Sequence, residues 1–335
     1  MTDEVSGMLD GGHLAFGPVP SRRLGSSLGV DVVPFKTCSY SCVYCQLGRT
    51  RHMTVTRRTY FPASKVVASV ERVLRLSPAR PDYVTIIGGG EPTLAANLRE
   101  VREGIELIWE GRIALLTNGS LFWRRAVRKD CLGFEVVLPT VSAGNADLFH
   151  RMHRPHPMIT FERYLEGLRS FAKEFTGELW VEVMLVRGLN DSSKALEEIS
   201  AIIRSLEPTR VHLTAPMRPP TERWVREPSR RAVQLALSII EGAEDVTGLE
   251  AEEFKVRLED EVEDLLAIAT MHPLREEQAQ HILMDAGMEG DQALDFLLEL
   301  VAEGRLRFER LGGSTFYRAL TPKKGRDEKG SDRVS

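Results

Sequence analysis

Cysteine is scarce in this chain of 335 residues, which contains only four. The first residues, MTDEVSGMLDGG, lack the apolar segment of a signal peptide, and no apolar run reaches the roughly 18 residues that a membrane helix needs. Neither sign of charge dominates, because the net charge is −4, so the chain as a whole has no electrostatic signature of nucleic-acid binding. We therefore expect a cytoplasmic protein without membrane segments, whose thiols stay reduced.

Six short apolar runs alternate with segments of helical periodicity. The runs lie at 28–33, 83–87, 113–116, 134–138, 179–186 and 211–213, and their Val and Ile content favours strands buried on both faces of a parallel sheet. Helices are predicted at 64–76, 98–109, 121–128, 160–175 and 192–206. Six βα units are too few for a closed eight-stranded barrel. The pattern predicts an α/β fold, either an open six-stranded partial barrel or a doubly wound sheet.

Composition divides the chain further. We expect an N-terminal arm (1–16), the barrel (17–221), a helical extension (222–270), a winged-helix-like domain (271–320) and a disordered tail (321–335). The winged-helix-like domain is predicted from two helices, at 274–286 and 291–303, and a hairpin that turns at Gly312 and Gly313. The second helix is acidic and would repel phosphate, so it favours a protein contact. Arginines in the hairpin leave nucleic-acid binding as an alternative.

Polar and flexible segments follow the predicted strands. They read GGGEPT (88–93), TNGS (117–120), PTVSAG (139–144), RGLND (187–191) and TAPMRPP (214–220). In parallel α/β folds, such segments meet at the carboxyl end of the sheet, where ligands bind. Because the cysteine-containing segment follows the first strand, we expect it at the same end.

The segment 34–50, PFKTCSYSCVYCQLGRT, carries three of the four cysteines, Cys38, Cys42 and Cys45. A disulfide would leave one thiol over, and a redox pair or nucleophile does not need three. Zinc would need a fourth ligand, for which His52 is a candidate. Cys131 belongs to the opposite end of the sheet and is expected to be a small buried hydrophobic residue. The fourth possibility is a [4Fe–4S] cluster with three protein thiolates and one open iron.

With Tyr44 before the last cysteine, this segment resembles the motif of the radical S-adenosylmethionine (SAM) superfamily. The residues GGGEP after the second strand resemble the Gly-Gly-Glu motif of the same superfamily. The resemblance covers about residues 17–220 and implies a six-stranded partial (β/α)6 barrel. It implies that the three cysteines hold a [4Fe–4S] cluster and that SAM chelates the fourth iron. An electron from a flavodoxin- or ferredoxin-like donor would cleave SAM to methionine and a 5′-deoxyadenosyl radical, which abstracts hydrogen from a substrate.

The resemblance also implies cofactor-binding residues. Tyr44 would lie near the adenine of SAM, and Gly89, Gly90 and Glu91 would lie near its amine, where glycine lets the backbone approach closely. Ser142 resembles the polar position that contacts SAM in the superfamily.

Two further residues are candidates for the same pocket. Asn118 either lines it or stabilises a turn. Glu182 lies in an otherwise apolar strand, where a charge needs a partner, so it either faces SAM or the substrate or forms a buried ion pair.

Four residues are candidates for the substrate. Arg22 and Arg23 suit phosphate or carboxylate groups, with a structural salt bridge as the alternative. Arg49 follows the cysteines closely, and His153 is expected in a loop after the fourth strand, where prolines interrupt a helix.

Segments 17–38, 139–157 and 182–191 resemble the Fe–S oxidoreductase group related to tRNA wyosine synthases. Those enzymes use pyruvate, a Schiff-base lysine and a second cluster with cysteines near the N-terminus. Residues 1–37 contain no cysteine, and Lys36 is the only lysine beside the motif, so the wyosine reaction does not carry over. We expect a radical SAM enzyme with a small-molecule, peptide or RNA substrate. The alternatives are a tRNA-modifying enzyme of the wyosine type and a zinc-stabilised winged-helix regulator.

Overall fold

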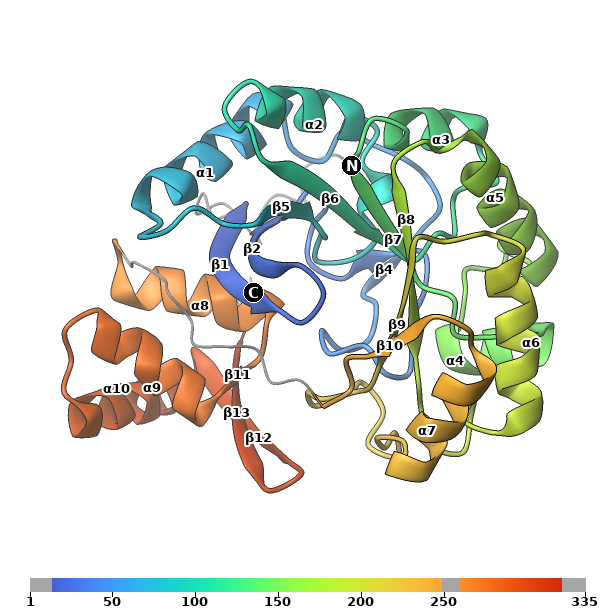
Figure 1. The fold of residues 1–335 in the computed structure, drawn as a ribbon. Coiled ribbons are helices and arrows are strands. Elements are labelled where there is room, and N and C mark those ends of the chain that lie inside the picture. The colour runs from blue at the N-terminus through green and yellow to red at the C-terminus, as the bar shows by residue number, and fades with distance from the viewer. Residues whose placement is uncertain (1–13, 249–258, 321–335) are drawn as a thin grey trace, which may run out of the picture.

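The computed structural model describes residues 14–248 and 259–320 (Figure 1). Its main sheet has eight strands in the order β1-β2-β5-β6-β7-β8-β9-β10. They are β1 (Ala15–Ser21), β2 (Gly25–Val30), β5 (Tyr83–Ile86), β6 (Arg112–Thr117), β7 (Val136–Pro139), β8 (Glu178–Met184), β9 (Arg210–Thr214) and β10 (Ala243–Asp245). All neighbours pair in parallel except β1 and β2, which are antiparallel. The predicted α/β class with a parallel sheet is confirmed.

The sequence predicted six strands, but the sheet has eight, because the two edge strands were not predicted. The six expected strands correspond to β2 and to β5 through β9. Strand β1 escaped prediction because Pro18 and Pro20 interrupt it, and proline is tolerated mainly on edge strands. Strand β10 is short and charged, with Glu244 and Asp245 exposed at the other edge.

Helices cover the outer face of the curved sheet (Figure 1). They are α1 (Ala63–Leu76), α2 (Leu98–Glu106), α3 (Arg125–Cys131), α4 (Ala146–His153), α5 (Phe161–Glu174), α6 (Ser193–Arg204) and α7 (Arg230–Ile239). Their apolar faces and the strands form one large buried core. Helix α6 is capped at its start by Ser192, whose side chain accepts a hydrogen bond from the Ala195 N–H.

Helix α4 contradicts the expectation of a loop after the fourth predicted strand. It runs to His153 and ends because Arg154 adopts a left-handed conformation, with φ of 45°. Pro155 therefore follows the helix rather than interrupting it.

The C-terminal elements form a second, smaller unit of structure. They are α8 (Glu261–Met271), β11 (Leu274–Arg275), α9 (Glu276–Asp285), α10 (Gly290–Ala302), β12 (Leu306–Leu311) and β13 (Ser314–Ala319). The strands form a sheet in the order β11-β13-β12. The predicted hairpin turn is confirmed, since Gly312 and Gly313 both have positive φ, 58° and 87°.

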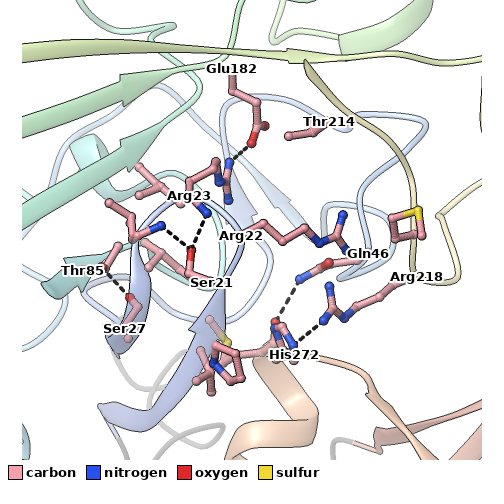
Figure 2. A pocket seen from close by; sticks show the side chains of 18 of the residues that line it. Ser21, Arg22, Arg23, Ser27, Gln46, Thr85, Glu182, Thr214, Arg218 and His272 are labelled. Carbon is pink, nitrogen blue, oxygen red and sulfur yellow. Dashed lines mark hydrogen bonds and ion pairs between the residues drawn. The ribbon is translucent and has the colours of Figure 1, made fainter. Parts of the chain in front are cut away.

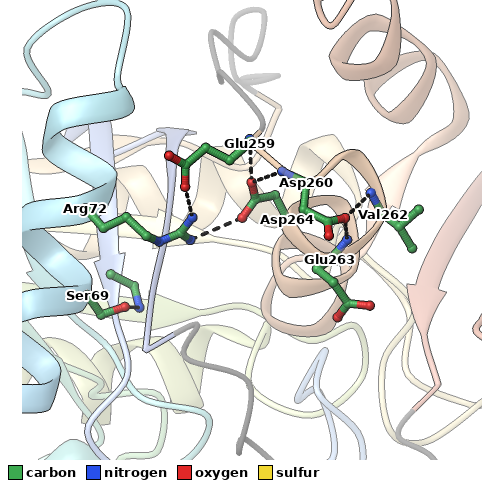
Figure 3. A network of polar contacts seen from close by, with 8 residues as sticks. Ser69, Arg72, Glu259, Asp260, Val262, Glu263 and Asp264 are labelled. Carbon is green, nitrogen blue, oxygen red and sulfur yellow. Dashed lines mark hydrogen bonds and ion pairs between the residues drawn. The ribbon is translucent and has the colours of Figure 1, made fainter.

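This C-terminal unit packs against the barrel through β1 and α1. Phe16 and Val19 of β1 share a buried core with Leu265 and Ile268 of α8. In Figure 3, Arg72 of α1 donates to the Glu259 carboxylate at 3.1 Å and to that of Asp264 at 3.2 Å. The start of α8 is thus anchored to α1, and its end approaches the interior of the barrel.

Most of the predicted N-terminal arm and the predicted disordered tail lie outside the described residues. The domain boundaries stay predictions. Across residues 14–248 and 259–320, no helix combines the length and the apolar character needed to cross a membrane.

Candidate active site

The segment 34–50, which we call the cysteine loop, follows β2 and is closed at its base by backbone hydrogen bonds. The Lys36 carbonyl accepts from the N–H groups of Arg51 and His52, each at 3.1 Å. Beside them, β3 (Thr37–Cys38) and β4 (His52–Met53) form a short parallel ladder. The three clustered cysteines therefore lie on one closed loop at the carboxyl end of the sheet.

The glycine segment after β5 packs directly on this loop. Lys36 N–H donates to the Gly89 carbonyl at 2.6 Å, and Glu91 N–H donates to the Thr37 carbonyl at 3.1 Å. A Cβ on Gly90 would stand 1.7 Å from the Thr37 oxygen. Glycine is required here because two backbones approach closely. Contact of Gly89 and Gly90 with SAM stays a prediction.

Glu91 is a buried carboxylate that joins the ends of β5 and β6. It accepts hydrogen bonds from Thr93, from the Thr117 hydroxyl at 2.6 Å and from the Asn118 N–H at 2.8 Å. Burial raises the pKa of Glu91, and these hydrogen bonds oppose the rise. The Asn118 amide in turn donates to Ser39 at 3.0 Å and lies 3.8 Å from the Cys38 sulfur. Glu91 and Asn118 thus belong to one network beside the first cysteine.

Nitrogen groups surround the three thiols. Lys36 Nζ lies 3.2 Å from the Cys45 sulfur, and His153 Nδ1 lies 3.5 Å from that of Cys42. Burial raises the pKa of Cys38 to about 12 and that of Cys42 well above its ordinary value. Because hydrogen bonds to cluster sulfurs tune Fe–S centres, the Lys36 ammonium beside Cys45 and the Asn118 amide near Cys38 fit a cysteine-held cluster.

Within the described part of the chain, no three His, Cys, Asp or Glu side chains are placed to hold a metal ion. The assignment of the cysteines therefore rests on their motif and on these donors. Cys131, at the end of α3, is fully buried, as expected of a small hydrophobic residue.

His153 supports the cysteine loop from the end of α4. It is only 1% exposed, its Nδ1 lies 3.1 Å from the Tyr44 hydroxyl, and its carbonyl accepts from the Ser41 N–H at 2.9 Å. Burial lowers the pKa of His153 to about 3, so the imidazole is neutral at pH 7. It lies in a helix behind the loop, and the expected position in a loop is wrong.

Ser142 and Glu182 lie on neighbouring strand ends. The Ser142 hydroxyl is buried and accepts from the Met184 N–H at 2.8 Å. Glu182 forms an ion pair with Arg23, and its side chain stays 14% exposed. The ion pair anticipated for Glu182 is therefore present, and the same residue also faces a cavity.

This cavity, which we call the barrel cavity, has a volume of about 180 Å³. Inward-facing residues of the strands form its floor, including Ser27, Thr85 and Thr214, and Tyr44 of the cysteine loop forms part of its wall. Figure 2 shows Arg22, Arg23 and Glu182 around it. Arg49 lies elsewhere, 72% exposed and paired with Glu222 at 3.0 Å. The four substrate candidates are thus not brought together.

Three residues of this region were missed by sequence reasoning. Arg218 and His272 line the barrel cavity. Asp31, beside the glycine segment, accepts from the Gly89 N–H at 2.7 Å and the Val33 N–H at 3.2 Å. Burial raises the pKa of Asp31 to about 6. The available signals were an aspartate within the apolar run LGVDVV and an arginine in the segment after the sixth predicted strand.

Comparison with known proteins agrees with these features. Residues 32–199 match the radical SAM superfamily. A UPF0026 protein of Methanocaldococcus jannaschii is 35% identical over 311 residues, which cover 91% of this chain and 95% of that protein.

Two solved structures are also similar. A radical SAM methyltransferase from Sphaerobacter thermophilus gives a TM-score of 0.49 at 21% identity over 66% of each chain. TYW1 with a lysine–pyruvate adduct bound gives 0.45 at 14% identity over 90% of this chain and 85% of that one. By the superfamily match and the archaeal relative, this chain belongs to the radical SAM superfamily of enzymes and, within it, to the UPF0026 proteins.

Proposed function

We propose that this radical SAM enzyme holds a [4Fe–4S] cluster on Cys38, Cys42 and Cys45, and that SAM binds the iron left open. The observation that carries the proposal is the cysteine loop itself. Backbone bonds fix it against residues 89–91, and it contributes Tyr44 to the wall of the barrel cavity. When bound, the reduced cluster and SAM would supply a 5′-deoxyadenosyl radical, which takes one hydrogen atom from a substrate C–H bond.

The chain's own residues would hold and shield these groups. Lys36 and Asn118 donate toward cluster sulfurs, and Gly89 and Gly90 offer backbone carbonyls to the SAM amine. Tyr44 packs near the adenine. The substrate would occupy the barrel cavity beside Tyr44, and exclusion of water from the loaded site would protect a reactive radical.

Anaerobic reconstitution with iron, sulfide, dithionite and SAM tests the proposal. We expect about four irons with labile sulfide per chain and formation of 5′-deoxyadenosine. Cys42→Ala should lose both, because one thiolate ligand is removed. Cys131→Ala is the matched control and should retain both, since Cys131 lies in the core. Retention of cluster and product by Cys42→Ala would contradict the proposal, and zinc without sulfide would favour the regulator.

A second candidate, an RNA-modifying enzyme, is favoured by a basic cleft beside the hairpin β12–β13. The cleft has a volume of about 1170 Å³. We call it the arginine cleft. The charged residues in its lining are Arg187, Arg223, Arg226, Arg307, Arg310 and Arg318, with Glu227 and Glu309. This local excess of positive charge contrasts with a net charge of −4 for the chain. Phe308, 51% exposed in the lining, offers a ring on which a base can stack.

Titration with bulk tRNA at several salt concentrations tests this candidate. We expect an affinity that falls steeply with salt and a shallower salt slope for the double variant Arg226→Gln, Arg310→Gln. Equal slopes for both proteins, or binding of an acidic peptide alone, would count against RNA.

We further infer a cytoplasmic location and an electron donor of the flavodoxin or ferredoxin type. The order helix, strand, helix, helix and hairpin in residues 261–319 supports a winged-helix-like module. Such a module offers a surface for a protein partner.

A further inference from the structure

The barrel cavity has walls of different chemical character. Its floor carries hydroxyl groups, including Ser27 and Thr85, whose oxygens are 2.6 Å apart. On another side, Arg218 from the loop after β9 and His272 from the end of α8 line it together with Arg22 (Figure 2). Three segments far apart in the sequence therefore place cationic and imidazole groups against one small space.

Arg218 is held there by neutral partners. Its Nε donates to the Pro273 carbonyl at 3.0 Å, and its NH2 contacts His272 Nε2. A guanidinium has no acceptor, so Nε2 of His272 must accept and the ring proton must be on Nδ1. Burial also lowers the pKa of His272 well below its ordinary value, which agrees with a neutral imidazole. None of these contacts neutralises the charge of Arg218.

Two further arginines lie near Arg218 and affect its pKa. Burial first, and then the charges of Arg22 and Arg275, lower the pKa of Arg218 to about 9. Arg218 therefore remains protonated at pH 7. The carboxylate of Glu182, in the same lining, is engaged by Arg23. A bound anion would give Arg218 an opposite charge, which its neutral partners do not provide.

We propose that Arg218, which lines the barrel cavity beside Arg22, provides a subsite for an anionic group of the substrate, a carboxylate or a phosphate. Guanidinium groups favour these two anions because their N–H donors match the geometry of the oxygens. This inference depends on the proposed function in one respect, namely that the bound anion is part of the substrate. The end of α8 completes the subsite, because His272 and the Pro273 carbonyl orient Arg218.

Calorimetric titration of the full-length, cluster-loaded protein tests the subsite. Inorganic phosphate and acetate are the two probes, at constant ionic strength with chloride as the reference anion. We expect saturable binding of at least one probe, and the stronger probe identifies the class of anion. Arg218→Gln should weaken it at least tenfold, whereas Arg218→Lys should weaken it less because the charge remains. Arg75→Gln, an exposed arginine on α1, is the matched control and should bind as the wild type does.

Three outcomes would overturn the subsite. The first is that neither probe binds saturably, and the second is that Arg218→Gln binds the probe as the wild type does. The third is that SAM displaces the probe, which would mean that the subsite belongs to the cofactor. If Arg218→Gln fails to fold, Arg218→Lys provides the comparison with wild type, with a smaller expected loss of about threefold. Because the readout is anion binding, failure of SAM cleavage in a protein that binds the probe would overturn the proposed function and leave the subsite intact.

Discussion

Two sides of the barrel cavity differ in how the chain builds them. The cysteine-loop side comes from residues 31–52 and 88–91, and backbone hydrogen bonds and a glycine contact hold it together. The α8 side comes from residues near 22, 218 and 272, and side chains hold it together. The close contact at Gly90 leaves no room for a side chain, whereas the contacts of Arg218 can be changed by one substitution. Under the proposed function, the first side would hold the cluster and SAM, and the second side would bind the substrate.

On the cysteine-loop side, we expect the largest loss of stability from a substitution at Gly90. In Gly90→Ala, the added methyl group would collide with the Thr37 carbonyl, 1.7 Å away, and push the glycine segment off the loop. We expect a loss of at least about 3 kcal/mol in the free energy of unfolding, as for severe overpacking. Iron content after reconstitution should fall as well. Chemical denaturation and iron analysis measure the two effects.

Gly290→Ala is the matched control, because its methyl group would meet only the Met284 sulfur at 3.9 Å. This variant should keep wild-type stability and iron content. If both variants behave alike, the close backbone contact is not what fixes the loop.

The buried carboxyl group of Asp31 gives a second prediction for the same side. Its pKa is raised from 3.8 to about 6 in the folded protein, so the native state binds more protons than the unfolded state between these values. The free energy of unfolding therefore falls as pH rises through this window, by up to about 3 kcal/mol at roughly 1.4 kcal/mol per pKa unit. Asn does not titrate. Relative to wild type, Asp31→Asn should gain stability between pH 4 and pH 7.

Urea denaturation of both proteins at several pH values measures this gain. A stability difference that stays constant with pH would show that Asp31 ionises in the folded protein as it does in the unfolded chain.

The α8 side should respond more mildly, and at a distance, to loss of Arg72. Arg72→Gln removes the charged contacts that anchor Glu259 and Asp264 to α1. We expect about 1 kcal/mol of destabilisation, because the network is partly exposed. Amide exchange should accelerate in α8 but not in the cysteine loop. Arg99→Gln, which breaks an exposed pair within α2, should cost less than about 0.5 kcal/mol. Equal exchange in α8 for both variants would argue against the anchor.

The same contrast explains what could be predicted from the sequence. The cysteine motif and the glycine segment are each a continuous stretch of sequence. The spacing within them and their positions after two predicted strands indicated the superfamily. The six inner strands were readable because burial on both faces makes them apolar throughout. Strands β1 and β10 could not be predicted in this way, because edge positions tolerate proline and charged residues. These are Pro18 and Pro20 in β1 and Glu244 and Asp245 in β10.

The α8 side of the cavity could not be predicted from the sequence, because it depends on tertiary packing. Nothing in the sequence around His272 indicates that it will meet Arg218, 54 residues away. His153 was placed wrongly for a similar reason. A left-handed Arg154 lets α4 run up to the proline, and non-glycine residues rarely adopt that conformation.

The closure of the cysteine loop at Lys36 has a consequence for the stability of the proposed cluster. With positive φ (62°), this one residue bonds both to the glycine segment and to the far end of the loop at Arg51 and His52. We therefore expect the entropy of closing this ring to be lost when the polypeptide folds rather than when iron binds. Small zinc domains differ, because in them metal binding and folding are one event. For the proposed cluster, we therefore expect that loss of iron in air leaves the loop folded, and that activity returns when the cluster is rebuilt.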